Sequence, residues 1–159
     1  MQEFISKSLE DTKEITSNLV VSLDSLIKYK EKATVIGLYG DLGSGKTTFM
    51  KYFAAALGIK ETIQSPTFII MKKYEIPVNN YKLHFTDFNN LIHIDAYRIE
   101  KSEELLKLGW EEIIKDPQNL ICIEWPEHVN QIIPPHIMIR FDHLEDEKAH
   151  ENQRKISIA

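Results

Sequence analysis

Two of the six glycines, together with a lysine and a threonine, form the feature that most constrains the fold. Gly40, Gly45, Lys46 and Thr47 follow the spacing Gly-x-x-x-x-Gly-Lys-Thr, which is the pattern of a phosphate-binding loop, or P-loop. Glycines permit backbone conformations that turn successive N–H groups inward around an anion. In such a loop the lysine reaches the β- and γ-phosphates of a nucleotide, and the threonine hydroxyl ligates Mg²⁺.

The residues around this loop predict a strand before it and a helix after it. Residues 33–39 are an apolar run rich in β-branched side chains, which is typical of a buried strand. Apolar residues then recur on one helical face between Phe49 and Leu57, and Gly58 follows where a helix would end. Strand, glycine turn and helix are the arrangement that a phosphate-binding loop requires.

The rest of the chain predicts further strands and helices. Ser8 and Asp11 have the spacing of a capping box, which starts a helix that runs to about residue 30. A second helical segment, broken near Gly109, is expected at residues 102–115. Strands are expected at residues 3–7, 67–71, 81–85, 91–95, 120–124, 137–141 and 155–158. The strands at 67–71 and 81–85 would form a hairpin, the last two would be antiparallel neighbours, and the acidic stretch 142–151 would be a solvated loop.

These elements predict an α/β fold in which a mixed β-sheet is flanked by helices, formed as a single P-loop NTPase domain over residues 1–159. The length of 159 residues suits one domain. A net charge of −5 disfavours a chain that grips a nucleic-acid backbone by itself. Cys122 is the one cysteine, so no internal disulfide is expected. The sequence shows neither a signal peptide nor a membrane span, which predicts a cytoplasmic protein without membrane contact.

Two carboxylates end apolar strands. Asp95 and Glu124 each close such a run, and the carboxyl ends of parallel strands share one edge of a sheet, facing the crevice where ligands bind. One of the two would hold Mg²⁺ and the other would orient or deprotonate the nucleophile. The pattern leaves open which acid has which role. Ser65-Pro66-Thr67 lies where a segment that senses the γ-phosphate is found in other P-loop proteins.

Four ordered blocks resemble the TsaE (YjeE-type) ATPases of bacterial tRNA threonylcarbamoyladenosine synthesis. They are Gly40 to Phe49, Ser65-Pro66-Thr67-Phe68, His93-Ile94-Asp95-Ala96-Tyr97-Arg98 and Glu124-Trp125-Pro126. The resemblance implies an ATPase that uses ATP and Mg²⁺. Its partner would be the TsaB–TsaD heterodimer, which forms N6-threonylcarbamoyladenosine on tRNA, and the chain would meet tRNA only through that complex.

The resemblance also implies the roles of individual residues. Lys46, Asp95 and Glu124 would be catalytic, with Thr47 and Glu124 on the Mg²⁺ side. Ser65, Pro66 and Thr67 would form a switch-like loop. The nucleotide-binding residues would be Asp41, Leu42, Gly43, Ser44, Gly45, Lys46, Thr47, Thr48 and Trp125.

Two other functional classes compete with this interpretation. A small-molecule P-loop kinase commonly uses several arginines to clamp phosphates, whereas this chain has only Arg98, Arg140 and Arg154. A nucleotide-dependent binding module with little turnover is the second alternative. A GTPase is disfavoured, because no Asn-Lys-x-Asp segment occurs.

Overall fold

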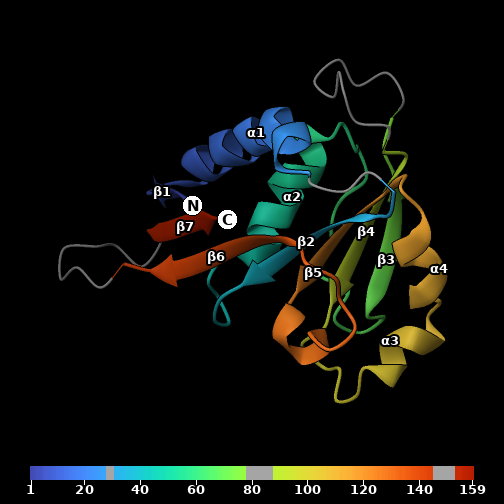
Figure 1. The fold of residues 1–159 in the computed structure, drawn as a ribbon. Helices are drawn as coiled ribbons and strands as arrows, with labels where there is room; N and C mark the ends of the chain where they lie inside the picture. The colour runs from blue at the N-terminus through green and yellow to red at the C-terminus, as the bar shows by residue number, and fades with distance from the viewer. Residues whose placement is uncertain (28–30, 78–87, 145–152) are drawn as a thin grey trace.

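A seven-stranded sheet organises the chain in the computed structural model, which describes residues 1–27, 31–77, 88–144 and 153–159 (Figure 1). The strands are β1 (Gln2–Ser6), β2 (Thr34–Tyr39), β3 (Met71–Glu75), β4 (Asn90–Asp95), β5 (Asn119–Glu124), β6 (Ile137–His143) and β7 (Arg154–Ile158). The helices are α1 (Leu9–Leu26), α2 (Lys46–Ala56), α3 (Glu103–Lys107) and α4 (Trp110–Lys115), with a 3₁₀ turn η1 (Pro126–Val129).

The sheet is mixed, as predicted, and its order is β1-β7-β6-β2-β5-β4-β3. The central strands β6, β2, β5 and β4 run parallel. β3 pairs antiparallel with β4, while β7 pairs antiparallel with both β6 and β1, which brings the two chain ends close together. The parallel centre places the carboxyl ends of β2, β4 and β5 at one edge of the sheet.

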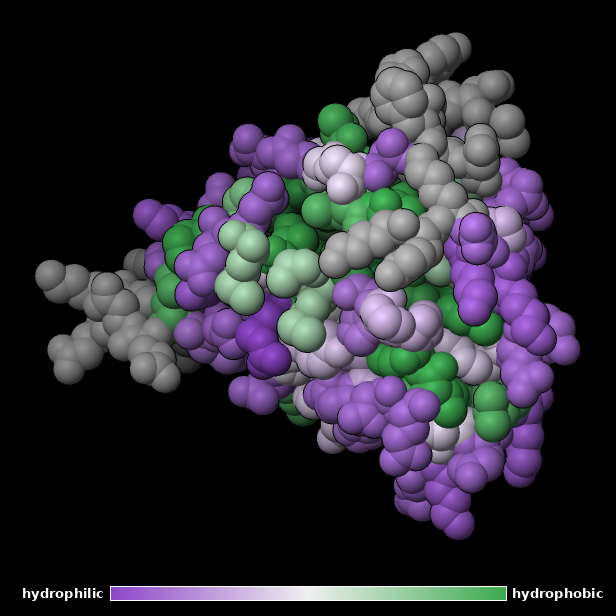
Figure 2. All heavy atoms as spheres, viewed as in Figure 1, coloured by the Kyte–Doolittle hydropathy of each residue, from purple (hydrophilic) through white to green (hydrophobic). Residues whose placement is uncertain are grey.

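Helices cover both faces of this sheet (Figure 1). Ile36 and Leu38 of β2 pack in the same cluster as the apolar residues of α1 and α2, whereas Val35 packs in the cluster that contains Trp110 of α4. All six residues of β5 are buried, as expected of a strand with both faces covered. In the view of Figure 2, hydrophilic side chains cover most of the side that carries α3 and α4, and hydrophobic ones show between them.

Most of the predicted elements are confirmed, with shifts of a few residues at their ends. Helix α1 ends at Leu26, and residues 28–30 lie outside the described part of the chain. The break near Gly109 separates α3 from α4, where this glycine has a φ of 83°. The acidic stretch begins inside β6, which runs to His143, and its residues 145–152 are outside the described ranges.

The predicted strand at residues 67–71 is wrong. Residues 67–70 form a turn, in which the N–H groups of Ile69 and Ile70 donate to the Pro66 carbonyl. The strand starts at Met71 and pairs with β4. The other half of the predicted hairpin, residues 81–85, lies outside the described residues. The turn prevails over the β propensity of its residues because the Thr67 side chain bonds to the carboxylate of Asp95.

The capping box at the start of α1 is present. Ser8 Oγ accepts from the N–H of Asp11 at 3.1 Å, and an Asp11 carboxylate oxygen accepts from the N–H of Lys7 at 2.7 Å. The latter bond is the main reason why the pKa of Asp11 is lowered. The first bond satisfies a backbone donor that the helix start would otherwise leave unpaired, and the second satisfies the N–H of the residue before the cap.

We expect Ser8→Ala to lower the free energy of unfolding by about 1 kcal/mol, because it removes the side chain that caps α1. Urea denaturation followed by circular dichroism measures the change. Ser22→Ala is the matched control, since Ser22 lies in the same helix and bonds only to carbonyl oxygens of the preceding turn. Equal stability losses in the two variants would contradict a capping role for Ser8.

Candidate functional site

The loop between β2 and α2 has the backbone geometry of a phosphate-binding loop. Gly40, Gly43 and Gly45 have φ values of 140°, 77° and 104°, which residues with a side chain rarely adopt. At Gly40 a Cβ atom would also lie 2.5 Å from the Phe141 carbonyl oxygen. Helix α2 begins directly after this loop, at Lys46, so its positive end faces the same space.

The Lys46 side chain is buried inside the site. Its ammonium donates to the carbonyl oxygens of Gly40 and Asp41, at 2.5 and 2.9 Å, and lies 3.9 Å from the centre of the Trp125 ring. Burial lowers the pKa of Lys46, and the negative charges of Glu124 and other nearby carboxylates oppose that shift. The site therefore holds the positive charge of the Lys46 ammonium beside the loop.

Glu124 lies against the start of α2. The Thr47 hydroxyl is 3.0 and 3.1 Å from the two Glu124 carboxylate oxygens, and Nε2 of His93 is 2.9 Å from Oε1. Glu124 is only 3% exposed, although it stands at the end of its strand. The parallel pairing of β5 with β2 causes this contact, because it places Glu124 beside Leu38, two residues before the loop.

Asp95, the second strand-end carboxylate, is held by the segment that follows α2. One of its oxygens accepts from the hydroxyls of Ser65 and Thr67, at 2.8 and 2.5 Å, and the other accepts from the N–H of Tyr97 at 3.0 Å. Asp95 pairs in register with Glu124 across β4 and β5. The structure thus brings the loop, both carboxylates and Ser65-Pro66-Thr67 to one edge of the sheet.

Trp125 joins the loop to a small group of aromatic side chains. Its backbone has a φ of 59°, in the left-handed region that is unusual for a bulky residue. This conformation starts η1, and the indole contacts the rings of Tyr97 and His128. Strained residues cluster at functional sites, and here the strained residue packs on the ammonium of Lys46.

The residues present fit a nucleotide phosphate with Mg²⁺. Ser44 Oγ is buried inside the loop without a hydrogen-bond partner among the described residues, as a group that faces a phosphate would be. Thr47 and Glu124 supply oxygen atoms, which Mg²⁺ prefers, and this ion usually takes few protein ligands and keeps several waters. The described residues contain no cluster of three or more His, Cys, Asp or Glu suited to a metal.

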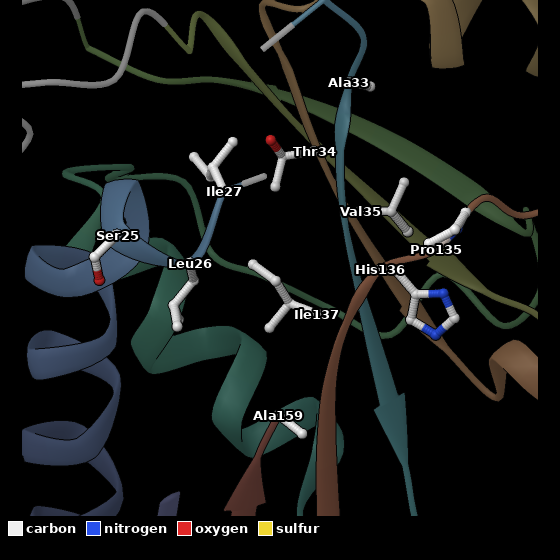
Figure 3. A pocket seen from close by; sticks show the side chains of 10 residues that line it. All are labelled: Ser25, Leu26, Ile27, Ala33, Thr34, Val35, Pro135, His136, Ile137 and Ala159. Atoms are coloured by element: carbon white, nitrogen blue, oxygen red, sulfur yellow. The ribbon is translucent and has the colours of Figure 1, made fainter. Parts of the chain in front are cut away.

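Two cavities differ in their relation to this site. One, of about 460 Å³, adjoins the loop between the start of α1 and β7, and Lys7, Thr12, Thr48 and Arg154 are among its lining residues. The other, of about 260 Å³, lies at the amino ends of β2 and β6, where Leu26 and Ile137 point toward the same space (Figure 3). Because the loop follows the carboxyl end of β2, the second cavity is remote from the candidate site.

Two contacts of the site were not predicted from the sequence. The guanidinium of Arg154, on β7, donates to the carbonyl oxygens of Ser44 and Gly43, at 2.9 and 3.2 Å. No local pattern relates Arg154 to a loop 110 residues away. The bond from His93 to Glu124 also lacked a specific signal, although His93 precedes Asp95 by two residues and therefore shares its face of β4.

Comparisons with known proteins agree with this geometry. The family model described as "Threonylcarbamoyl adenosine biosynthesis protein TsaE" matches residues 6–156. This chain belongs to the TsaE family. The tRNA threonylcarbamoyladenosine biosynthesis protein TsaE of Rickettsia bellii is 34% identical, over 93% of this chain and 94% of that protein. The TsaE protein of Aquifex aeolicus is 32% identical over 98% and 97%.

A solved structure shares the fold of this TsaE-family chain. The crystal structure of YdiB from Bacillus subtilis superposes with a TM-score of 0.69 at 26% identity, covering 99% of this chain and 83% of that one. The match spans the whole sheet, including the strands at both chain ends. The predicted P-loop NTPase fold and the family resemblance are therefore confirmed.

We expect Lys46→Ala to weaken the binding of Mg²⁺ and ATP about ten- to a hundredfold, because hydrogen bonds from a charged donor contribute roughly 1.5–3 kcal/mol. Isothermal titration calorimetry measures the affinity. Lys51→Ala is the control, since Lys51 is an exposed lysine on the same helix. Unchanged binding by the Lys46 variant would refute a phosphate-binding role for this lysine.

Proposed function

We propose that the chain, as a single domain over residues 1–159, is a Mg²⁺-dependent ATPase of tRNA N6-threonylcarbamoyladenosine biosynthesis that acts with the TsaB–TsaD heterodimer. The observation that carries the proposal is the contact between Thr47 and Glu124 beside the ammonium of Lys46. These groups are the parts that P-loop NTPases use for phosphate and magnesium. The relatives named as biosynthesis proteins TsaE support the pathway.

The phosphates of ATP would lie in the loop formed by residues 40–47. Inward N–H groups of the loop and the start of α2 would bind phosphate oxygens, and Lys46 would exchange its contacts with loop carbonyls for the β- and γ-phosphates. The Thr47 hydroxyl has one hydrogen and two lone pairs. It can therefore donate to Glu124 and still offer a lone pair to Mg²⁺. Bound Mg²⁺ neutralises charge on the phosphates.

The two carboxylates, Glu124 and Asp95, have different roles in this proposal. Glu124, bonded to Thr47, is the acid on the Mg²⁺ side. Asp95, bonded to Ser65 and Thr67, is the acid that orients the attacking water and reports on the γ-phosphate. The backbone just beyond Ser65-Pro66-Thr67 supports a switch role for that segment, because Ile70 has a φ of 66°. A β-branched residue in that conformation costs on the order of 1–2 kcal/mol, which a rearranged segment would release.

The cavity beside the loop suits the nucleoside part of ATP. Gly43, Ser44 and Gly45 belong to the loop and also line this cavity. The opposite wall of the cavity is the start of α1, near Lys7 and Thr12. A nucleotide with its phosphates in the loop would thus place its sugar and base between α1 and β7. Polar groups on this wall, including the Thr12 hydroxyl, can bond to a sugar or a base.

Exposed apolar side chains near the site support a protein partner. Leu42 in the loop is 74% exposed, and Phe68 and Ile69, directly after Thr67, are 84% and 60% exposed. The guanidinium of Arg98 stacks on the Phe68 ring. Large apolar side chains exposed beside a site suit contact with another protein. The net charge of −5 agrees with an indirect relation to tRNA, since direct contacts to phosphates require cations.

The proposal also concerns where the protein works. None of the helices in the described ranges is both long and apolar enough to cross a membrane. We propose a cytoplasmic location, in keeping with the proposed role in tRNA modification.

The function is tested by measuring ATP turnover by the purified chain alone and with TsaB–TsaD, together with complex formation on a sizing column. We expect slow turnover by the chain alone and faster turnover in the complex. Nucleosides and small phosphate acceptors are tested in parallel. Transfer of phosphate to one of them would favour a kinase, and tight ATP binding without turnover in any mixture would favour a binding module.

We expect Glu124→Gln and Asp95→Asn each to lower ATP turnover about a hundredfold or more, because each replaces a charged group at the reacting phosphates with a neutral one of the same shape. Thermal unfolding should change much less than turnover. Glu111→Gln is the control, since Glu111 is an exposed carboxylate on α4. Normal turnover by either site variant would refute the role given to that carboxylate.

A further inference from the structure

We infer that His93 is a positioning residue, which holds the Glu124 carboxylate in the orientation that receives the Mg²⁺–nucleotide. The inference rests on the proposed function and adds a residue to it. His93 lies inside β4 and is completely buried. Its Nε2 atom is 2.9 Å from Oε1 of Glu124, on the neighbouring strand β5.

Glu124 depends on this contact because it has few other donors. A buried carboxylate needs hydrogen bonds to compensate for its loss of hydration. Within the described part of the chain, its side-chain partners are the Thr47 hydroxyl and the His93 ring. The oxygen atom of Thr47 is also the proposed Mg²⁺ ligand, so that hydroxyl serves two partners. His93 is the donor that serves the carboxylate alone.

The two bonds also determine how the carboxylate is turned. The terminal torsion of a glutamate side chain is broad and has no strong preference of its own. His93 bonds to Oε1 only, whereas the hydroxyl of Thr47 is within reach of both oxygens. His93 on β4 and Thr47 on α2 therefore fix the carboxylate from two directions, and Oε2 is the oxygen that His93 leaves available.

The surroundings of the ring select one tautomer. An ionised carboxylate only accepts hydrogen bonds, so the proton must lie on Nε2 of His93. The other ring nitrogen, Nδ1, is buried and has no protein partner among the described residues. In this buried position, an unprotonated Nδ1 without a hydrogen bond costs less free energy than an Nδ1–H without an acceptor would. The ring of His93 is thus oriented to donate to Glu124. Residues that hydrogen-bond to a metal ligand and orient it are arranged in this way.

The chain offers substitutions that separate positioning from packing. In His93→Gln the side-chain amide can place a donor where Nε2 lies, whereas in His93→Asn the shorter amide places it near Nδ1. Both variants bury one neutral amide. Cys122→Ala is the packing control, because Cys122 pairs in register with His93, is equally buried and lies two residues before Glu124. Burial and the Glu124 charge raise the pKa of Cys122, which keeps it a neutral thiol.

The experiment measures the affinity for a non-hydrolysed ATP analogue by calorimetry, with Mg²⁺ and with EDTA, and the melting temperature of each variant. The ratio of the two affinities is the gain due to Mg²⁺. We expect His93→Asn to lower this gain about tenfold or more, as lost support of a metal ligand does, while its affinity in EDTA stays within about twofold of wild type. His93→Gln and Cys122→Ala should keep the gain.

Several outcomes would overturn the inference. It fails if His93→Asn keeps the full gain, if His93→Gln loses as much as His93→Asn, or if Cys122→Ala loses the gain equally. If the histidine variants do not fold, nitrogen NMR of the wild-type imidazole decides: a proton on Nε2 supports the inference, and one on Nδ1 refutes it. A wild-type protein that binds no analogue under either condition would refute the proposed function as well, which distinguishes the two failures.

Discussion

The parallel pairing of β2 with β5 is the constraint on which the candidate site depends. It places Glu124 at the carboxyl end of β5 next to the end of β2, from which the phosphate-binding loop leaves the sheet. The Thr47 hydroxyl then meets both carboxylate oxygens. A different neighbour for β2 would leave a complete loop without this acid, because the two residues are 77 positions apart in the chain.

The neighbouring strand, β4, adds further polar side chains to the same edge of the sheet. β4 pairs with β5 in a register that aligns Asp95 with Glu124 and His93 with Cys122. These four side chains share one face of the sheet, which the cluster containing α1 and α2 covers. Because these side chains are buried, a polar group left without a hydrogen bond among them would cost free energy of folding, which makes their polar contacts specific. Asp95 in turn holds Ser65 and Thr67, so the proposed switch is anchored to the sheet through a carboxylate.

Errors of prediction fall where a distant partner decides the backbone. Residues 67–71 are rich in β-forming side chains, yet 67–70 turn because Thr67 bonds to Asp95 and Ile70 donates to the Pro66 carbonyl. β propensity describes how a side chain fits a half-buried sheet and is easily overridden by such contacts. Trp125, for which no backbone conformation was predicted, adopts a left-handed conformation that its own side chain disfavours. In both places the strained backbone lies beside the candidate site.

Local patterns were sufficient for the features that depend on neighbouring residues. The glycine spacing predicts the loop and the helix behind it, and apolar runs that end in Asp95 and Glu124 predict strands with terminal acids, because these features follow from short-range geometry and periodicity. Tertiary structure alone decided the strand order, the pairing of Glu124 with Thr47 and of Asp95 with Ser65 and Thr67, and the contacts of His93 and Arg154. Each of these joins residues far apart in the chain, so its geometry exists only once the sheet has assembled.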